Sequence, residues 1–453
     1  MTIMTTTQHD SIRQHARDRQ MPSVHGSEPE PKSSLTSTAD EKHFSEKDTS
    51  EAQVLPPKDI VCTPPEQDHD GDFPDGGTRA WLIVVGAMCS TFSTFGYVNS
   101  WGIFQGYYQE TLLSSTPPSN IAWIGSIQYS LVFLPALIVG RFFDLGYFRV
   151  LYAGASATIV IATFLIAQCT QYWHFLLCQG IMVGLGAGGI FCPTSAVVTH
   201  WFKKRRGFAF GMVAVGSSIG GTVLPIVAKN LLPRVGFQWT IRIFGFILLC
   251  VLGVSNILLR RRLPPVKVKG GLLNLAAFKD LAYTVYCLSA FTIFLGIYTL
   301  LTYVSVTATR IGIPPDFAFY FVAIGNASSL FGRFAAGSLS DMIGPMNVMI
   351  PFTTFAAVVA YCWPFAETKT ALIVVTVIYG FNSGAYVALL SNPIMEMGST
   401  SDIGRRTGMC MSILALGALA GPPIAGAINT ATGGFKAVGY YAGGYRNHGF
   451  NER

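Results

Sequence analysis

The sequence predicts an all-α membrane protein built from two similar halves. Three observations support this fold class: long apolar segments, cations concentrated in alternate connecting loops, and a motif pattern that recurs in the second half of the chain. The composition agrees, because 50% of the 453 residues are hydrophobic and only 12% are charged. Soluble domains carry about 25% charged residues, so the composition excludes an ordinary soluble domain.

The N-terminal region, residues 1–73, differs in composition from the rest of the chain. It is rich in Ser, Thr, Pro, Glu, Lys and His and has few aromatic residues. Such a segment cannot bury enough apolar surface to offset the chain entropy lost on folding, so we expect a disordered cytoplasmic tail. Because no apolar region lies near the N-terminus, we expect no cleavable signal peptide, and the first span does the targeting.

Long apolar segments define the expected membrane spans. A transmembrane helix needs about 20 mostly apolar residues. Eleven segments meet this requirement: 80–107, 119–140, 150–169, 173–199, 207–228, 237–259, 281–307, 317–340, 348–365, 371–395 and 408–429.

Basic residues indicate how these spans are oriented. Cations at 203–206 follow the fourth span and cations at 260–262 follow the sixth, whereas loops 109–118 and 170–172 contain none. Cytoplasmic loops carry an excess of Lys and Arg, so we place the N-terminus in the cytoplasm of a multi-pass protein, expected in the plasma membrane. The expected parts are a tail (1–73), an N-terminal six-helix bundle (74–259), a cytoplasmic linker (260–280), a C-terminal helix bundle (281–430) and an atypical polar ending (431–453).

An internal repeat relates the two halves. The second span ends with Gly140 and Asp144 four residues apart, and the eighth ends in the same way with Gly337 and Asp341. Repeated halves are typical of secondary transporters. The sequence therefore predicts two parallel six-helix bundles. A second recurrence consists of glycines that follow a basic pair: Gly207, Gly216 and Gly220, then Gly408, Gly417 and Gly421.

Small residues in the fifth span indicate close helix packing. Small residues at membrane helix interfaces let two backbones approach closely. We expect one helix face to carry the glycines of this span, which are Gly207, Gly211, Gly216 and Gly220.

Three motifs resemble those of a known transporter family. GRFFDLGYFR, which begins at Gly140, resembles the loop signature of the major facilitator superfamily. The Asp75-Gly-Gly motif and the Trp-Phe-x-x-Arg-Arg-Gly loop at 201–207 resemble the fungal type of its monocarboxylate-transporter-like branch. The resemblance covers roughly residues 74–440 and implies transport by alternating access. It also implies twelve spans, yet the longest uncharged run after Asn429 is 437–445, so we expect the twelfth helix to be missing or truncated.

The sequence departs from the monocarboxylate carriers at two positions. The resemblance implies a lysine ligand late in the first span, where this chain has Asn99. It also implies an aspartate one turn before an essential arginine in the eighth span. The arginine is retained as Arg333, whereas the aspartate position is Ser329. These departures favour a larger, acidic metabolite over a small monocarboxylate.

Arg333 is the main candidate for a substrate ligand. It lies within the apolar span 317–340, where a charge is costly unless it faces an aqueous cavity or a partner. Asn326, Ser329 and Arg333 follow one another at spacings of three and four residues, so the three share a helix face. With Asn99 and Tyr298 they form the expected substrate site. The alternative is that Arg333 extends to the cytoplasmic boundary and only anchors its helix.

The repeated aspartates are the expected conformational latch. The resemblance implies that each meets a helix N-terminus of the other half, where unpaired N–H groups favour an anion. Simple loop polarity is the alternative. The expected latch set consists of Gly140, Asp144, Arg149, Gly337, Asp341, Arg205 and Arg206.

The sequence predicts a secondary transporter of a small organic metabolite, with efflux of a fungal secondary metabolite or organic acid as the preferred function. The alternatives are proton-coupled uptake of a monocarboxylate or vitamin, and a non-transporting sensor or inactive truncated product.

No catalytic triad, phosphate loop or metal-ligand spacing occurs in the sequence, so we expect no enzyme, cofactor or metal. The expected partners are the substrate, anionic if it pairs with Arg333, and the lipid bilayer. The basic excess lies in loops beside spans and does not indicate nucleic-acid binding.

Overall fold

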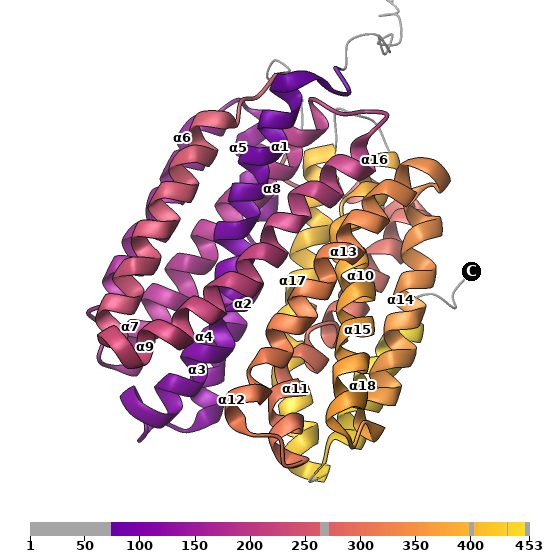
Figure 1. Cartoon of the computed structure of the whole chain (residues 1–453). Coiled ribbons are helices and arrows are strands. Elements are labelled where there is room, and N and C mark those ends of the chain that lie inside the picture. Colours follow the sequence, from indigo (N-terminus) through magenta and orange to yellow (C-terminus); the bar gives the residue numbers. More distant parts are fainter. Residues whose placement is uncertain (1–73, 263–270, 398–402, 433, 449–453) are drawn as a thin grey trace, which may run out of the picture. The chain divides into compact units, whose positions relative to one another are not determined.

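The computed structural model describes residues 74–262, 271–397, 403–432 and 434–448. The predicted tail at 1–73 and the middle of the predicted linker, 263–270, lie outside the described residues. All described elements are helical, and no strand occurs among them (Figure 1). The predicted all-α fold class is therefore confirmed.

The first half of the described chain consists of nine α-helices and three π-helical segments. The α-helices are α1 (Gly77–Thr91), α2 (Tyr97–Asn99), α3 (Trp101–Tyr107), α4 (Pro118–Leu131), α5 (Ala136–Asp144), α6 (Phe148–Ile166), α7 (Tyr172–Phe175), α8 (Gly184–Thr199) and α9 (Arg206–Leu258). The π-helical segments are η1 (Phe92–Gly96), η2 (Tyr108–Leu112) and η3 (Leu176–Val183).

The second half continues with nine more α-helices and two short 3₁₀ segments. The α-helices are α10 (Leu281–Gly296), α11 (Thr299–Arg310), α12 (Pro315–Ala318), α13 (Tyr320–Ile343), α14 (Pro345–Cys362), α15 (Lys369–Leu389), α16 (Asn392–Glu396), α17 (Ile403–Thr432) and α18 (Phe435–His448). The 3₁₀ segments are η4 (Leu275–Lys279) and η5 (Trp363–Phe365).

The helices account for the predicted spans. Nine helical segments in the described residues are long and apolar enough to cross a membrane. One of them, α9, contains two spans that meet at a kink at Gly236, whose φ of 74° is a left-handed conformation that suits glycine. α13 is not among the nine although it has 24 residues, because Asn326, Ser329 and Arg333 make it more polar. Together these segments match the predicted spans.

The two ends of the helices are chemically different. Asp341 and the cations at 203–206 lie together at one end, here called the basic end. α13 runs from the basic end to Tyr320, so α12 lies at the other end, here called the opposite end. Figure 1 shows α16 and α12 at these two ends.

The glycines of α9 face two different neighbours, which corrects the prediction of a single face. A Cβ added to Gly211 would lie 2.7 Å from the carbonyl oxygen of Arg333 in α13, in the second half. A Cβ added to Gly220 would lie 2.8 Å from the Cα of Gly96 in η1, in the first half. Gly207 likewise faces α13, and Gly216 faces α1. The reason is that nine residues rotate an α-helix by about 180° beyond whole turns.

α17 repeats this arrangement in the second half, as the predicted duplication requires. A Cβ on Gly408 would lie 2.8 Å from the Cα of Leu137 in α5, in the first half. Cβ atoms on Gly417 and Gly421 would each lie 2.5 Å from a carbonyl oxygen of α10, in their own half. Each half thus sends one glycine-rich helix against the other half.

The C-terminal region forms a short helix. α18 has 14 residues, about 21 Å at 1.5 Å per residue, against a hydrocarbon thickness of about 30 Å. It packs against α10 and α14. A Cβ on Gly443 would lie 2.7 Å from the ring of Tyr361, and one on Gly296 would lie 2.7 Å from the carbonyl oxygen of Ala442. A short helix therefore follows the eleventh span, and it is not among the described segments that are long and apolar enough to cross a membrane.

Candidate substrate site and the contacts between the halves

A small cavity lies between the two halves. Its volume is about 30 Å³, which is room for a water molecule and not for an organic metabolite. All five predicted substrate-site residues line it, two through α2 and the break before α11 (Asn99 and Tyr298) and three through α13 (Asn326, Ser329 and Arg333). Its other lining residues are Phe95, Tyr129, Ile297, Leu301, Ser383, Gly384 and Val387.

Irregular helix segments bring side chains to this cavity. α10 ends at Gly296 and α11 begins at Thr299, so Tyr298 lies in a break between them. The hydroxyl of Tyr379 donates a 2.5 Å hydrogen bond to the carbonyl of Ile297 at this break. On the other side, the π-helical segment η1 precedes Asn99. Such π-bulges frequently mark functional sites.

Arg333 is a buried cation between the halves. Its side chain is 7% exposed. One terminal nitrogen, Nη1, donates a 2.7 Å hydrogen bond to the carbonyl of Ala214 and a second bond to the hydroxyl of Ser217, both in α9. Its Nε has no hydrogen-bond partner, and no carboxylate of the described residues forms an ion pair with Arg333. Burial and these contacts argue against the alternative in which Arg333 extends to the cytoplasmic boundary.

Further polar contacts cross the cavity. The hydroxyls of Ser218 and Ser329 lie 2.7 Å apart, and Asn326 donates a 3.2 Å hydrogen bond to the carbonyl of Gly221. Tyr129 donates a 2.9 Å hydrogen bond to Asn99, and its ring centroid lies 4.3 Å from that of Tyr298. In the described state these contacts join polar groups of the two halves, whereas the Arg333 Nε has no hydrogen-bond partner.

The sequence prediction missed four polar residues at this site. They are Tyr129, Ser217, Ser218 and Ser383. Ser217 and Ser218 are adjacent in the glycine-rich span, and a polar pair inside an apolar helix was the signal available for them. Nothing in the sequence alone distinguishes Tyr129 or Ser383 from ordinary packing residues.

Carboxylates and histidines lie away from the cavity. Its lining residues in the described chain include no Asp, Glu or His. His200 follows α8 at the basic end, where burial and the neighbouring cations Arg261 and Arg262 lower its pKa to about 4. His200 is therefore neutral near pH 7 and adds no charge to the basic end.

Asp341 joins the halves at the basic end. Its carboxylate accepts backbone hydrogen bonds of 2.6 Å from Gly207 and 2.9 Å from Phe208, in the first turn of α9. Gly337 lies one turn earlier in α13, and a Cβ there would be 2.9 Å from the Cα of Gly211. These N–H groups have no partner within the helix, so the carboxylate satisfies donors of the other half.

Asp144 occupies the matching position of the first half. A Cβ added to Gly404, in the first turn of α17, would lie 2.7 Å from its carboxylate. Gly140 also faces Gly404, since a Cβ on Gly140 would lie 3.1 Å from the Gly404 carbonyl oxygen. The structure thus brings together Gly140, Asp144, Gly337 and Asp341 at two equivalent junctions.

The three predicted latch cations take different positions. Arg206 is half-buried beside the carboxylates of Glu396 and Asp341 in the second half. Arg205 is exposed, and its backbone N–H donates a hydrogen bond to Asp75. Arg149 is exposed and, within the described chain, makes no hydrogen bond or ion pair. The structure therefore places Arg206 at the latch and does not bring Arg149 to it.

Asp75 is a further residue at the basic end that was not assigned a role from sequence. Its carboxylate accepts backbone hydrogen bonds from Lys203, Lys204 and Arg205, at 2.7, 2.8 and 3.3 Å. Its own φ of 44° is unusual for a residue other than glycine. Asp75 thus fixes the start of α1 to the loop that precedes α9.

Comparisons with known proteins give the family. The sequence model of the Major Facilitator Superfamily matches residues 83–392. MFS-type transporter 1 of an Ophiocordyceps species is 38% identical over 387 residues, covering 85% of this chain and 84% of its own. The aspyridones efflux protein of Emericella nidulans is 37% identical over 380 residues, covering 83% and 77%.

A solved structure supports the same fold. The crystal structure of the human organic anion transporter MFSD10 superposes with a TM-score of 0.63, covering 83% of this chain and 99% of that chain. Its sequence identity is 16%, so this similarity supports the fold alone. The repeated helices, the junctions between the halves and the sequence matches lead to one conclusion: the chain belongs to the major facilitator superfamily.

Proposed function

We propose that this transporter exports an organic metabolite with an acidic group, and that Arg333 binds that group. One observation carries the proposal: Arg333 is buried between the halves, and its described contacts are a carbonyl and a hydroxyl. A buried charge without an opposite charge is costly, and a guanidinium binds a carboxylate with two parallel hydrogen bonds. An acidic substrate would replace the weaker contacts of Arg333 to α9.

Efflux is supported by the relatives. The Emericella nidulans protein is named for the efflux of aspyridones, and the agnestins efflux protein of Paecilomyces divaricatus is 34% identical over 350 residues. Members of this superfamily move their substrate by rocking two halves around a central site. We assign the same mode to this chain, with the basic end facing the cytoplasm of a plasma-membrane protein.

Membership of the monocarboxylate-transporter-like branch is part of this proposal. Arg333 at the ligand position and the Asp75-Gly-Gly motif support it. Asn99 and Ser329 stand where that branch has charged groups, which supports a substrate larger than a small monocarboxylate. Proton-coupled uptake of such a monocarboxylate is the competing function.

Paired ligands test the acidic group directly. Thermal unfolding of the purified protein would be measured with fungal carboxylic-acid metabolites and with the methyl ester of each. We expect a matching acid to raise the unfolding temperature and its ester not to, because the ester carries no charge. Arg333→Ala should abolish this difference, and Arg333→Lys should recover only part, because an ammonium cannot form the two-pronged contact.

Export is tested in the producing cells. Acidic metabolites would be measured inside and outside cells that carry the wild-type protein, Arg333→Ala, or the control Arg242→Lys. Arg242 lies in α9 over the ring of Trp239 and does not line the cavity. We expect intracellular accumulation with Arg333→Ala alone, at normal protein levels in the membrane. Export at the wild-type rate by Arg333→Lys would refute the two-pronged contact with the substrate. Normal export by Arg333→Ala would refute any role of Arg333 in substrate binding.

A further inference from the structure

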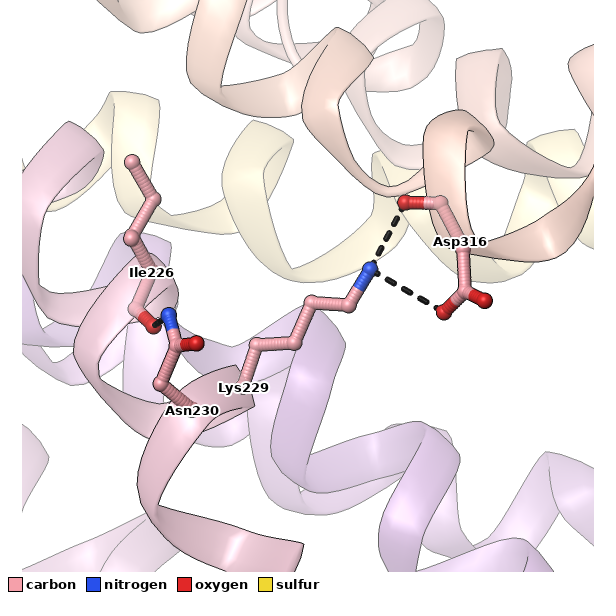
Figure 2. Close-up of polar contacts among 4 residues, drawn as sticks. All are labelled: Ile226, Lys229, Asn230 and Asp316. Atoms are coloured by element: carbon pink, nitrogen blue, oxygen red, sulfur yellow. Dashed lines mark hydrogen bonds and ion pairs between the residues drawn. The ribbon is translucent and has the colours of Figure 1, made fainter.

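An ion pair joins the two halves at the opposite end. Lys229 lies in α9 of the first half, and Asp316 lies in α12 of the second half. The Lys229 Nζ is 3.3 Å from the carboxylate of Asp316 and donates a 2.6 Å hydrogen bond to its backbone carbonyl. Figure 2 shows both contacts, with the Lys229 side chain extended from α9 toward α12. This ion pair between described residues therefore connects α9 of the first half to α12 of the second half.

Two aromatic rings of the second half complete the surroundings of Lys229. Its Nζ lies 5.0 Å from the ring centroid of Phe319 and 4.8 Å from that of Tyr320, distances at which a cation is attracted to an aromatic face. The side chain of Lys229 is 28% exposed, whereas that of Asp316 is 97% exposed. Water therefore screens the carboxylate contact, and the carbonyl and the rings contribute to holding Lys229.

The ion pair lies beyond the cavity, toward the opposite end. Lys229 is eight residues beyond Gly221, about 12 Å along the helix, and a Cβ on Gly221 would contact both Asn99 and Asn326 of the cavity. Tyr320 begins α13, which carries Asn326 and Arg333. α9 and the segment that contains α12 and α13, which contact each other beside the cavity, therefore meet again at this ion pair.

The size of the cavity requires one end to open. At about 30 Å³ the cavity has no room for an organic metabolite, and the halves contact each other at the basic end through Asp341 and at the opposite end through Lys229. Exit by the opposite end requires the two halves to separate there. Because Lys229 belongs to the first half and Asp316, Phe319 and Tyr320 belong to the second, this separation breaks their contacts.

We propose that Lys229, Asp316, Phe319 and Tyr320 form the gate at the opposite end of the transport path. The gate is closed when Lys229 is bound to the second half and opens when these contacts break. The proposal rests on the alternating-access part of the proposed function and not on the acidity of the substrate. Opening also uncovers the Lys229 ammonium beside the exit route.

The test measures access to the cavity without any substrate. Leu301→Cys places a thiol in the cavity lining, in a background in which the exposed Cys250 and Cys362 are serine. Intact cells would be treated from outside with a cationic and, separately, an anionic membrane-impermeant methanethiosulfonate. A merely electrostatic effect of Lys229 would change the two labelling rates in opposite directions, whereas gate opening raises both.

We expect Lys229→Met to raise both rates about tenfold. Asp316→Asn should raise them less, because the backbone carbonyl and both rings remain. The matched control is Arg234→Met, since Arg234 is an exposed cation of α9 that forms no hydrogen bond or ion pair within the described chain. Its rates should equal those of the parent.

Unchanged rates in both Lys229→Met and Asp316→Asn would overturn the gate. The exposed Asp316→Asn variant provides the test if Lys229→Met does not reach the membrane, and unchanged labelling rates in that variant would then count against the gate. The experiments distinguish failure of the gate from failure of the acidic-substrate site. Faster labelling in the gate variants with normal export by Arg333→Ala would keep the gate and refute the acidic-substrate site.

Discussion

At the scale of single residues, the site is closed by side chains that bind one another in place of a substrate. Arg333 donates to the Ala214 carbonyl and to Ser217, while the Ser218 and Ser329 hydroxyls lie 2.7 Å apart. Each contact links α9 to α13, so each one stabilises the closed state and must break when the halves separate. We therefore expect these residues to influence both substrate binding and the balance between closed and open states.

Ser218→Ala should shift that balance toward open states. The substitution removes one hydrogen bond between the halves, worth about 1 kcal/mol, or about a fivefold change in the equilibrium. Ser329 keeps its 2.7 Å bond to the carbonyl of Asn326, so no buried group loses its last partner. Labelling of a Val387→Cys reporter in the cavity should become faster. Ser338→Ala is the control, because the half-buried Ser338 bonds only within α13, and equal rates in the two variants would contradict the prediction.

At the scale of elements, α9 has two glycine faces with different roles. Gly207 and Gly211 contact α13 of the other half, a surface that must separate in each transport cycle. Gly216 and Gly220 contact α1 and η1 of the same half, a surface that stays packed. The same small residue therefore serves movement on one face and folding on the other.

Two valine substitutions should separate these roles. Gly211→Val places a side chain against the Arg333 carbonyl, so the basic end should fail to close while the first half folds normally. Gly220→Val should instead cost about 1–3 kcal/mol of stability through overpacking within one half. Thermal unfolding in detergent measures the second effect, and cavity labelling from the basic end measures the first. Gly253→Val is the control, since a Cβ at Gly253 meets no atom within 4 Å. Identical behaviour of all three would contradict the assignment.

At the scale of the whole molecule, the duplication produces two equivalent junctions at the basic end. Asp341 meets the first turn of α9, and Asp144 meets the first turn of α17. We therefore infer that both aspartates favour the state in which the basic end is closed. The opposite end has the Lys229–Asp316 contact, so the balance between the ends depends on charges at both.

Asp341→Asn and Asp144→Asn should each bias the carrier toward opening at the basic end. Hydrogen bonds to a charged group contribute about 1.5–3 kcal/mol, so the equilibrium should shift at least tenfold, and the double variant should shift it further. Cavity labelling from the basic side reports the change, with near-normal protein levels in the membrane. Asp280→Asn is the control, because Asp280 caps α10 of its own half by accepting from Ala282. Unchanged labelling in both variants would refute the latch.

The sequence by itself determined the helices, their approximate limits and their duplication. Apolar length and the cost of unpaired backbone groups in lipid leave a helix as the available structure for each long apolar segment. Local residue order was also enough to place Asn326, Ser329 and Arg333 on one face of α13. The recurring Gly-x-x-x-Asp pattern marked both junctions, because each motif is contained in a single short stretch.

Only the tertiary structure decided which helix each feature meets. The rotation along α9 sends Gly211 to α13 and Gly220 to η1, and contact with Gly221 brings Asn99 of the first half to Asn326 of the second. α18 packs against α10 and α14 although its sequence is short and polar for a membrane helix. Lys229 and Asp316 are distant in sequence, and neither stands in a recognisable motif. Contacts between segments remote in the chain depend on the packing of whole helices, and no local pattern of residues encodes that packing.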